Sequence, residues 1–600
     1  MSNQSSRTFT RALVLALFVL ACFSAALAQT PSPTPVNPAT QPPGQQVPPA
    51  TVPPGTNVTP ATPQPTPIQP AMQEPREPNF PDVQPQPVPP LPDLTRVGVS
   101  SSNVLPLSLN DAIRKALQNN NDIEVARDDV RFAEQQLRSL EGIYQPIFSI
   151  TPQLIHNITP QQSSLGGGGS AGTTTVTTFN FSPSITKAFS TGGGNYTLSF
   201  ANSRTTSSSL FSSISPFYSS NLSLSFTQPL LRNRSIDNNR RLIRIQKKQI
   251  QQSDSDFRAR TIQIISQVQA AYWNLVFALR NQQNQLDSLN VSRQNMRNIE
   301  AQISAGAKAP LDRAQVQTDI ASRESNLFIA TQTVSQAENS LKQLMLRDPM
   351  APEWSAQLTP TDTPAFDLSP VNLTAALEEA HKNRPELRRL DLQKDINQID
   401  LQYYNNQIRP QVDLTGTVAA TGLAGTPCNP ITNTRCSPPP TNLVGGYGKD
   451  LTNLFGLGTR NLTVGVAISF PLHNQTAKAN LAGARIQREQ LAASFRSQDQ
   501  AIEMDVRNAA QSVDTAQRRM VASRQARESA EQQLAGEQKL YEVGRSTTFL
   551  LLQRQTELTN ARTSELAAQT DYNKALADLQ RATSATLRVN NVVVSDPTKP

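Results

Sequence analysis

The residues most able to do chemistry are few in this chain and lie far apart. Its three histidines, His156, His381 and His473, do not have the spacing that holds a metal ion. No H-E-x-x-H, P-loop or G-x-S-x-G motif occurs in the 600 residues. The glycine run Gly166–Gly169 resembles a phosphate cradle only in composition, because no Lys-Ser/Thr follows it at the right place. We therefore expect no enzyme, no cofactor and no metal site.

The three cysteines indicate export rather than catalysis. Cys428 and Cys436 lie in a loop rich in Pro, Asn and Thr, and we expect a disulfide that closes a small surface loop. Cys22 ends a Val-Leu-Ala-Cys stretch that loosely resembles a lipoprotein cleavage box, which would make it a lipidated first residue. The alternative, cleavage after Ala28 in an Ala-Leu-Ala sequence, fits better. Both interpretations export the protein.

The N-terminal part of the chain reads as a signal followed by a linker. Residues 1–28 form a signal peptide in this interpretation, with Arg7 and Arg11 before an apolar run. Residues 29–95 hold half of the chain's 46 prolines and cannot form a core, so we expect an extended, disordered linker.

Composition and charge limit the classes of function. Only 37% of the residues are hydrophobic and the mean hydropathy is −0.41, which suits thin, solvated walls better than a thick core. The net charge of +8 comes from interspersed acids and bases, as on solvated helix faces. The densest basic stretch, from Arg232 to Lys248, lacks interleaved aromatics, so nucleic acid is not an expected partner.

The chain contains the same succession of landmarks twice. Residues 109–146 and 373–410 each read as a helix that stops before a proline. A β-like stretch then leads to a second proline, at 229 and at 471, and a long helical stretch with one glycine turn follows. A duplication of this size predicts two copies of one module. We assign residues 96–350 to the first copy, 351–589 to the second and 590–600 to a C-terminal tail.

The lengths of the helical stretches predict how they stack. The run from about 237 to 304 has a coiled-coil seam and is about twice as long as the returning run, 311–346. The helix at 109–143 has the missing length, so two short helices stacked end to end are expected to line each long one. Alternating residues between Pro146 and Pro229 predict strands. After the signal, no stretch has the roughly 18 apolar residues of a spanning helix, so any membrane crossing must use strands.

These landmarks resemble those of the TolC family of outer-membrane efflux proteins over about residues 105–589. The resemblance implies an internally duplicated α+β membrane protein that forms a homotrimer. Each chain would give about four strands, or more, to one outer-membrane β-barrel, which continues into a long periplasmic α-helical coiled-coil barrel. Two strands per copy would make about twelve in the trimer. The TGGGN turn at Thr191–Asn195 indicates an additional hairpin, either outside the membrane or within an enlarged barrel.

The resemblance also implies a periplasmic gate at the tips of the helical hairpins. Asp312 matches a gate-locking acid of the family and Tyr541 its aromatic partner on the other hairpin. Ser546 stands at the position of a tip arginine, for which the neighbouring Arg545 is the alternative, and Leu550 and Gln553 stand at those of two pore-narrowing aspartates. These three positions depart from the family pattern, and we expect weaker cation selectivity as a result. The alternative for Asp312 and Tyr541 is an acid at a helix start and a packed aromatic near a turn.

The function implied is a passive exit duct of a tripartite efflux or type I secretion system. The hairpin tips at Gly306, Pro310 and Gly544 would dock on a periplasmic adaptor (membrane fusion) protein, which binds an inner-membrane pump of the RND or ABC type. The protein would be located in the outer membrane of a diderm (Gram-negative) bacterium, with the barrel in lipid and the helices in the periplasm. The rival interpretation is a non-conducting coiled-coil scaffold that tethers the outer membrane to the cell wall.

Overall fold

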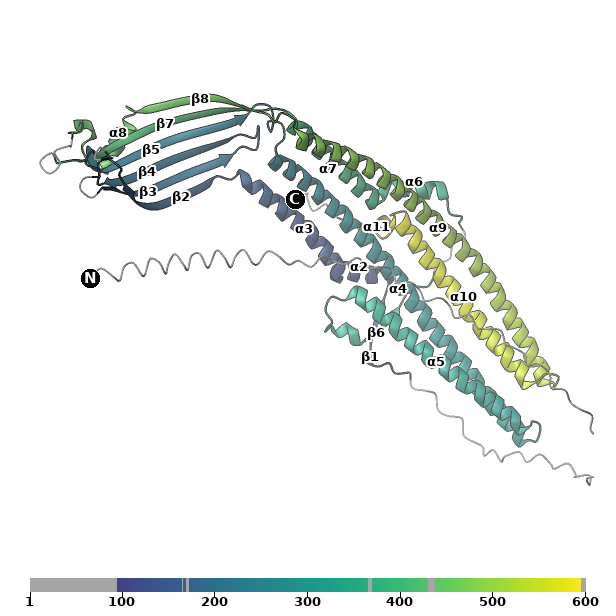
Figure 1. The fold of residues 1–600 in the computed structure, drawn as a ribbon. Coiled ribbons are helices and arrows are strands. Elements are labelled where there is room, and N and C mark those ends of the chain that lie inside the picture. Colours follow the sequence, from purple (N-terminus) through teal and green to yellow (C-terminus); the bar gives the residue numbers. More distant parts are fainter. Residues whose placement is uncertain (1–93, 164–165, 169–171, 365–368, 430–436, 595–600) are drawn as a thin grey trace, which may run out of the picture. The chain divides into compact units, whose positions relative to one another are not determined.

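The computed structural model describes residues 94–163, 166–168, 172–364, 369–429 and 437–594 (Figure 1). All of them belong to one of two compact units, which begins at Val83. The signal peptide at 1–28, almost all of the linker at 29–95, and the residues Cys22 and Cys436 lie outside the described residues.

Two long helical hairpins form most of the described chain. In the first, α4 runs for 67 residues and returns as α5; in the second, α9 runs for 68 residues and returns as α10. The predicted seam is buried, with Ile264, Val268 and Leu289 fully inaccessible. The bounds are Asn238–Ser304 for α4, Pro310–Met345 for α5, Gln475–Glu542 for α9 and Thr548–Ala582 for α10, with a short α11 at Thr586–Val589.

The predicted stacking of short helices on long ones is confirmed. On α4, α3 packs along the part nearer the sheet and α5 along the part nearer the tip (Figure 1). On α9, α7 and α10 do the same. Helix α4 also contacts α7 and α10, so it joins the two copies side by side.

The helix predicted at 109–143 is in fact two helices, and so is its counterpart at 373–408. Asn120 interrupts the first, because its side chain accepts hydrogen bonds from the backbone N–H groups of Asp122 and Ile123 and caps a new helix. In the second copy, Pro385 begins the new helix, where its missing N–H costs nothing. The bounds are Leu109–Asn119 for α2, Asn121–Glu141 for α3, Leu373–Asn383 for α6 and Pro385–Gln407 for α7.

Six antiparallel strands form one sheet at the end of this unit away from the hairpin tips (Figure 1). The order is β2-β3-β4-β5-β7-β8, with four strands from the first copy and two from the second. Six strands agree with the expectation of about four or more, and the additional hairpin expected at Thr191–Asn195 pairs within the sheet. The bounds are Ile147–Pro160 for β2, Thr173–Ala188 for β3, Asn195–Ser207 for β4, Ile214–Pro229 for β5, Gln411–Pro427 for β7 and Arg460–Ser469 for β8.

A small parallel pair of strands, β1 (Ser100–Leu107) and β6 (Ala356–Pro360), lies against the middle of the helices and was not predicted. Glu338 and Lys342 of α5 form a buried ion pair beneath it, with 2.8 Å between Oε1 and Nζ. Lys342 also donates a hydrogen bond to the carbonyl oxygen of Ala356. Arg96 binds the carboxylate of Glu338. These charges fix both strands to α5. Across the described residues, no helix is long and apolar enough to cross a membrane.

Candidate functional site: the sheet faces and the hairpin tips

The six-stranded sheet has one apolar face. In the pairing of β4 with β5, Leu198 lies opposite Leu224 and Phe200 opposite Leu222. Side chains alternate along a strand, so the register assigns the neighbouring strands' residues to the same face. Many of these apolar side chains are largely exposed, Leu154 at 70% and Val464 at 69%. Other members of this face are Phe148, Ile150, Phe179, Phe181, Ile185, Val418, Leu462 and Val466.

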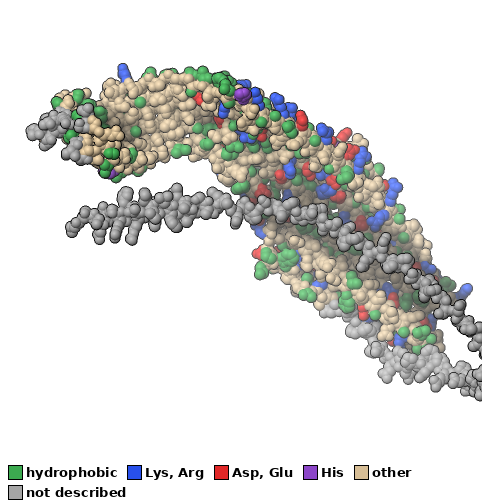
Figure 2. Space-filling view, viewed as in Figure 1, with side chains coloured by type: hydrophobic (Ala, Val, Ile, Leu, Met, Phe, Trp, Pro, Cys, Tyr) green, Lys and Arg blue, Asp and Glu red, His purple; other side chains and the backbone are tan. Residues whose placement is uncertain are grey.

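The opposite face of the sheet is made largely of hydroxyl groups. Ser149 and Ser184 lie 2.8 Å apart between their Oγ atoms, and Ser199 and Ser223 lie 2.7 Å apart. Thr186–Thr197 and Thr178–Thr205 make further cross-strand bonds on this face. We call this set the hydroxyl ladder. Figure 2 shows Lys, Arg, Asp and Glu gathered over the helices, whereas the visible surface of the sheet carries few of them.

Both edges of the described sheet are open. β2 and β8 are the outer strands, and nearly all of their side chains are exposed. Each outer strand leaves a row of backbone N–H and C=O groups without a strand partner among the described residues. Such an edge is a template for pairing with another strand.

The two hairpin tips have the same backbone construction. Gly306 and Gly544 adopt φ of +73° and +72°, a left-handed conformation that glycine reaches without strain. Pro310 occupies the first turn of α5, and the Thr547 side chain caps α10 by accepting from the Leu550 N–H. Equivalent turns therefore end both copies.

The structure places Asp312 and Tyr541 at the tips, and it gives Tyr541 a partner that the sequence analysis missed. Asp312 lies in the first turn of α5, where a carboxylate favours the helix dipole. The Lys308 ammonium of the first tip lies 4.7 Å from the centre of the Tyr541 ring on the second. The Tyr541 hydroxyl also lies 3.4 Å from Thr548 Oγ1. Within the described residues, Asp312 and Tyr541 share no hydrogen bond.

The other predicted gate residues lie beside Tyr541 on the second hairpin. The Ser546 hydroxyl donates to Glu537 Oε1, and the Gln553 amide donates to Glu557 Oε1 at 3.0 Å. Leu550 is 38% exposed. Behind the tips, a cavity of about 330 Å³ separates the two hairpins and is lined by Tyr541 and Gln555, among others.

Hydrogen bonds join the two hairpins at this cavity and along the helices beyond it. Asn284 donates to the Thr559 carbonyl oxygen at 3.1 Å, and Asn295 donates to Gln555 at 2.8 Å. An apolar cluster that contains Leu289 and Val316 of the first hairpin also includes Leu552 of α10, so apolar packing joins the two hairpins as well.

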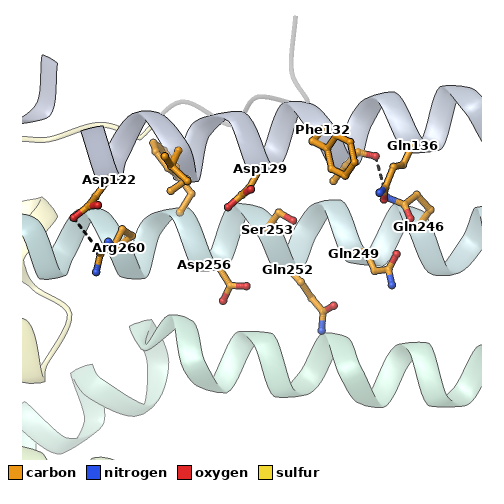
Figure 3. Close-up of a pocket in the computed structure, with 14 residues that line it drawn as sticks. Asp122, Asp129, Phe132, Gln136, Gln246, Gln249, Gln252, Ser253, Asp256 and Arg260 are labelled. Atoms are coloured by element: carbon orange, nitrogen blue, oxygen red, sulfur yellow. Dashed lines mark hydrogen bonds and ion pairs between the residues drawn. The ribbon is translucent and has the colours of Figure 1, made fainter. Parts of the chain in front are cut away.

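A groove of about 640 Å³ lies between α3 and α4 (Figure 3). Asp122 pairs with Arg260 across it at 2.7 Å, and Gln246 donates to the carbonyl oxygen of Ala133 at 2.9 Å. Asp129 and the exposed ring of Phe132 line the α3 side. Amides and carboxylates make up half of its lining, and the rest includes the apolar side chains of Val125 and Phe257, so the groove has no cluster of groups that indicates a specific site among the described residues.

Asp505 of α9 lies where the start of α7 and the end of α10 meet, and it contacts both. It accepts hydrogen bonds from Arg384, just before α7, and from Arg581, at the end of α10 (3.0 Å from Nη2). Burial raises the pKa of the Asp505 carboxyl, but the two guanidinium groups outweigh burial and hold that pKa below its usual range. The ion pairs therefore fasten α7 and α10 to α9.

The comparison with known families matches this arrangement. The model of the family described as "Outer membrane efflux protein" matches residues 194–345 and 376–585, more than half of the chain. The chain belongs to the outer membrane efflux protein family. The family match falls in two segments, one in each copy of the predicted duplication.

Solved structures share the fold of this outer membrane efflux protein at low sequence identity. A membrane protein from Pseudomonas aeruginosa is 17% identical, with a TM-score of 0.56 over 79% of this chain and 93% of that one. The CmeC outer membrane channel of Campylobacter jejuni is 15% identical, with a TM-score of 0.55 over 80% and 89%. The open state of the MtrE outer membrane channel of Neisseria gonorrhoeae is 18% identical, with a TM-score of 0.52 over 79% and 88%. None of the curated proteins matches the chain.

The remaining predicted positions of this outer membrane efflux protein lie apart from one another. His381 pairs with Asp499 at 2.9 Å and so connects α6 to α9, while His156 bonds Thr177 on the sheet. Cys428 follows β7 directly, and the disulfide with Cys436 stays a prediction because Cys436 is outside the described residues. Lys308 could not be found from the sequence alone, because its contact with Tyr541 joins positions more than two hundred residues apart.

Proposed function

We propose that this protein is the outer-membrane exit duct of a tripartite efflux or type I secretion system and that it works as a homotrimer. Three copies would join their open edges, β2 of one to β8 of the next, and close an eighteen-stranded barrel from three six-stranded sheets. Closing the barrel would give a hydrogen-bond partner to every backbone N–H and C=O group of the outer strands. Such groups cannot stay unpaired in lipid.

The separation of the two sheet faces carries this proposal. In a transmembrane barrel, residues alternate between a lipid-facing apolar side and a polar interior. The exposed Leu, Ile, Val and Phe side chains would meet lipid, and the hydroxyl ladder would line the passage. A scaffold anchored by a lipid alone would have no use for a hydroxylated inner face, so this observation favours the duct over the scaffold.

The hairpins would extend into the periplasm and dock by their tips on an adaptor protein. Leu311 and Phe549 near the tips are 67% and 63% exposed, and Val543 is 68% exposed. Apolar side chains this exposed at the end of a helical hairpin suit a protein partner. An inner-membrane pump of the RND or ABC type would drive transport, and this chain would supply a passive route.

The gate in this proposal lies at the same tips. Asp312 and Tyr541 keep the roles expected from the resemblance, with Lys308 as the direct partner of the Tyr541 ring. Leu550 and Gln553 replace the acidic ring of the family pattern, so the constriction would bind multivalent cations weakly.

Two measurements test the proposal together. The purified outer-membrane fraction should give the mass of a trimer, and the protein in planar bilayers should show single-channel conductance. A species other than a trimer that conducts no ions would overturn it.

A further inference from the structure

We propose that α8 (Tyr447–Phe455) is a membrane-interface helix that binds anionic lipid headgroups at the far rim of the sheet. The inference rests on the proposed function, because it takes the apolar face of the sheet to be the lipid side. It adds a binding surface and a lipid class that the duct itself does not require.

Helix α8 lies on the apolar face rather than in the passage. Asn202 and Ser220 are a cross-strand pair on this face, two residues beyond Phe200 and Leu222. Tyr447 donates to Asn202 Oδ1 at 3.0 Å, and Ser220 donates to the fully buried Asp450. These contacts hold the helix at the end of the sheet farthest from the other helices (Figure 1).

The segment around α8 also completes the sheet where β8 stops. The pairing of β7 with β8 ends at Ala420 and Arg460, so β7 extends farther than its neighbour. Asn453 of α8 donates to the Leu423 carbonyl oxygen at 2.9 Å, and the Gly445 N–H donates to the Gly425 carbonyl oxygen at 3.1 Å. Backbone groups that lipid would leave unpaired thus have partners.

The outer side of this segment combines apolar and basic groups. Phe455 and Leu457 are 64% and 55% exposed on a segment whose Leu454 is buried. Lys449 lies on α8, and Arg204 lies on β4 opposite Tyr218, whose ring is 5.8 Å from that of Tyr447. Neither cation has an ion pair with the described residues. An amphipathic helix with exposed aromatics and free cations is the pattern of a surface that sits between acyl chains and phosphates.

The partner that fits is an acyl lipid with a phosphate-bearing, negatively charged headgroup. Phe455 and Leu457 would enter the acyl region, while Lys449 and Arg204 would meet the phosphate. Each basic side chain near an anionic surface contributes about 1 kcal/mol, which is about a five-fold preference over a zwitterionic lipid.

Tryptophan reporters in the full-length protein, reconstituted in vesicles, test the inference. Phe455→Trp should be quenched by brominated phosphatidylcholine, and the equally exposed Phe549→Trp at the hairpin tip should not. Brominated phosphatidylglycerol should quench Trp at 455 more strongly than brominated phosphatidylcholine does. Lys449→Gln or Arg204→Gln should each reduce that preference about five-fold, whereas Lys539→Gln near the tip should leave it unchanged.

Leu224→Trp, on the apolar face itself, separates the two proposals. Quenching at 224 without quenching at 455 would overturn the interface helix and leave the duct standing. No quenching at either position would overturn the duct. Loss of the phosphatidylglycerol preference on adding inorganic phosphate would show a phosphate-ion site instead of a lipid site, and would also overturn the inference.

Discussion

Replacing Lys308 with Gln should open the proposed gate, because the lysine is the direct link between the two hairpin tips. Its ammonium lies 4.7 Å from the centre of the Tyr541 ring, within the range of about 6 Å for a cation–π contact. Both side chains are half-buried, so the contact should contribute about 0.5–1 kcal/mol in each chain. A trimer breaks three such contacts together, about 1.5–3 kcal/mol, which would raise the ratio of open to closed channels about tenfold to a hundredfold.

Single-channel recording in planar bilayers measures this ratio directly, and uptake of a large antibiotic by cells gives a second readout. Lys308→Arg and Tyr541→Phe are the matched controls. The first keeps the charge, and the second keeps the ring but loses the 3.4 Å contact of its hydroxyl with Thr548. Both should gate nearly as the native protein does.

The two partners should also behave as a unit. Tyr541→Leu should open the channel as Lys308→Gln does, and the double variant should add little to either, since one contact is lost only once. Full additivity would refute the reasoning. So would a Tyr541→Phe variant as open as Tyr541→Leu, because the hydroxyl and not the ring would then hold the tip.

Three further outcomes are expected. Asp312→Ala should raise the open fraction in bilayers, and unchanged conductance and antibiotic uptake would leave Asp312 as a helix-start acid only. The native channel should show weak block by divalent and trivalent cations because Leu550 and Gln553 carry no charge, and strong block at low concentration would contradict this. Asp505→Asn should lower the free energy of unfolding by about 2 kcal/mol, measured by denaturant titration, because Arg384 and Arg581 each lose one charged acceptor. Since the pKa of Asp505 is lowered in the folded state, its contribution is present above the ordinary carboxyl pKa and is lost as the pH falls through the lowered value; a stability difference between native and variant that persists at low pH would argue against it.

The long helices were predictable because their apolar spacing repeats over many turns. The sequence interpretation placed the first outgoing helix at about 237–304, and α4 runs from Asn238 to Ser304. The tip glycines were equally clear, since a break of helical spacing at a glycine indicates a left-handed turn. The interruptions at Asn120 and Pro385 were missed, although an asparagine cap and a proline at the first helical position are both visible in the sequence.

Features that depend on contacts between distant residues were not predictable. Alternating residues between Pro146 and Pro229 predicted strands, but only the pairing shows that β2 to β5 join one sheet with β7 and β8. The Glu338–Lys342 pair has the four-residue spacing of an ordinary surface pair on a helix, and only the structure shows that it is buried beneath β6. Lys308 belongs to no sequence motif that would predict its contact with Tyr541. In each case, the partner comes from another part of the chain.

In the proposed duct, the hydroxyl ladder would face any molecule inside the passage. Ser149 is hydrogen-bonded to Ser184, and Ser199 to Ser223, so each of these hydroxyl groups already has one partner on the wall. In the proposed duct, a solute would therefore gain little by exchanging its water shell for the wall, and it would stay only briefly at any one height. The width of the passage and the gradient along it would then determine the rate of transport.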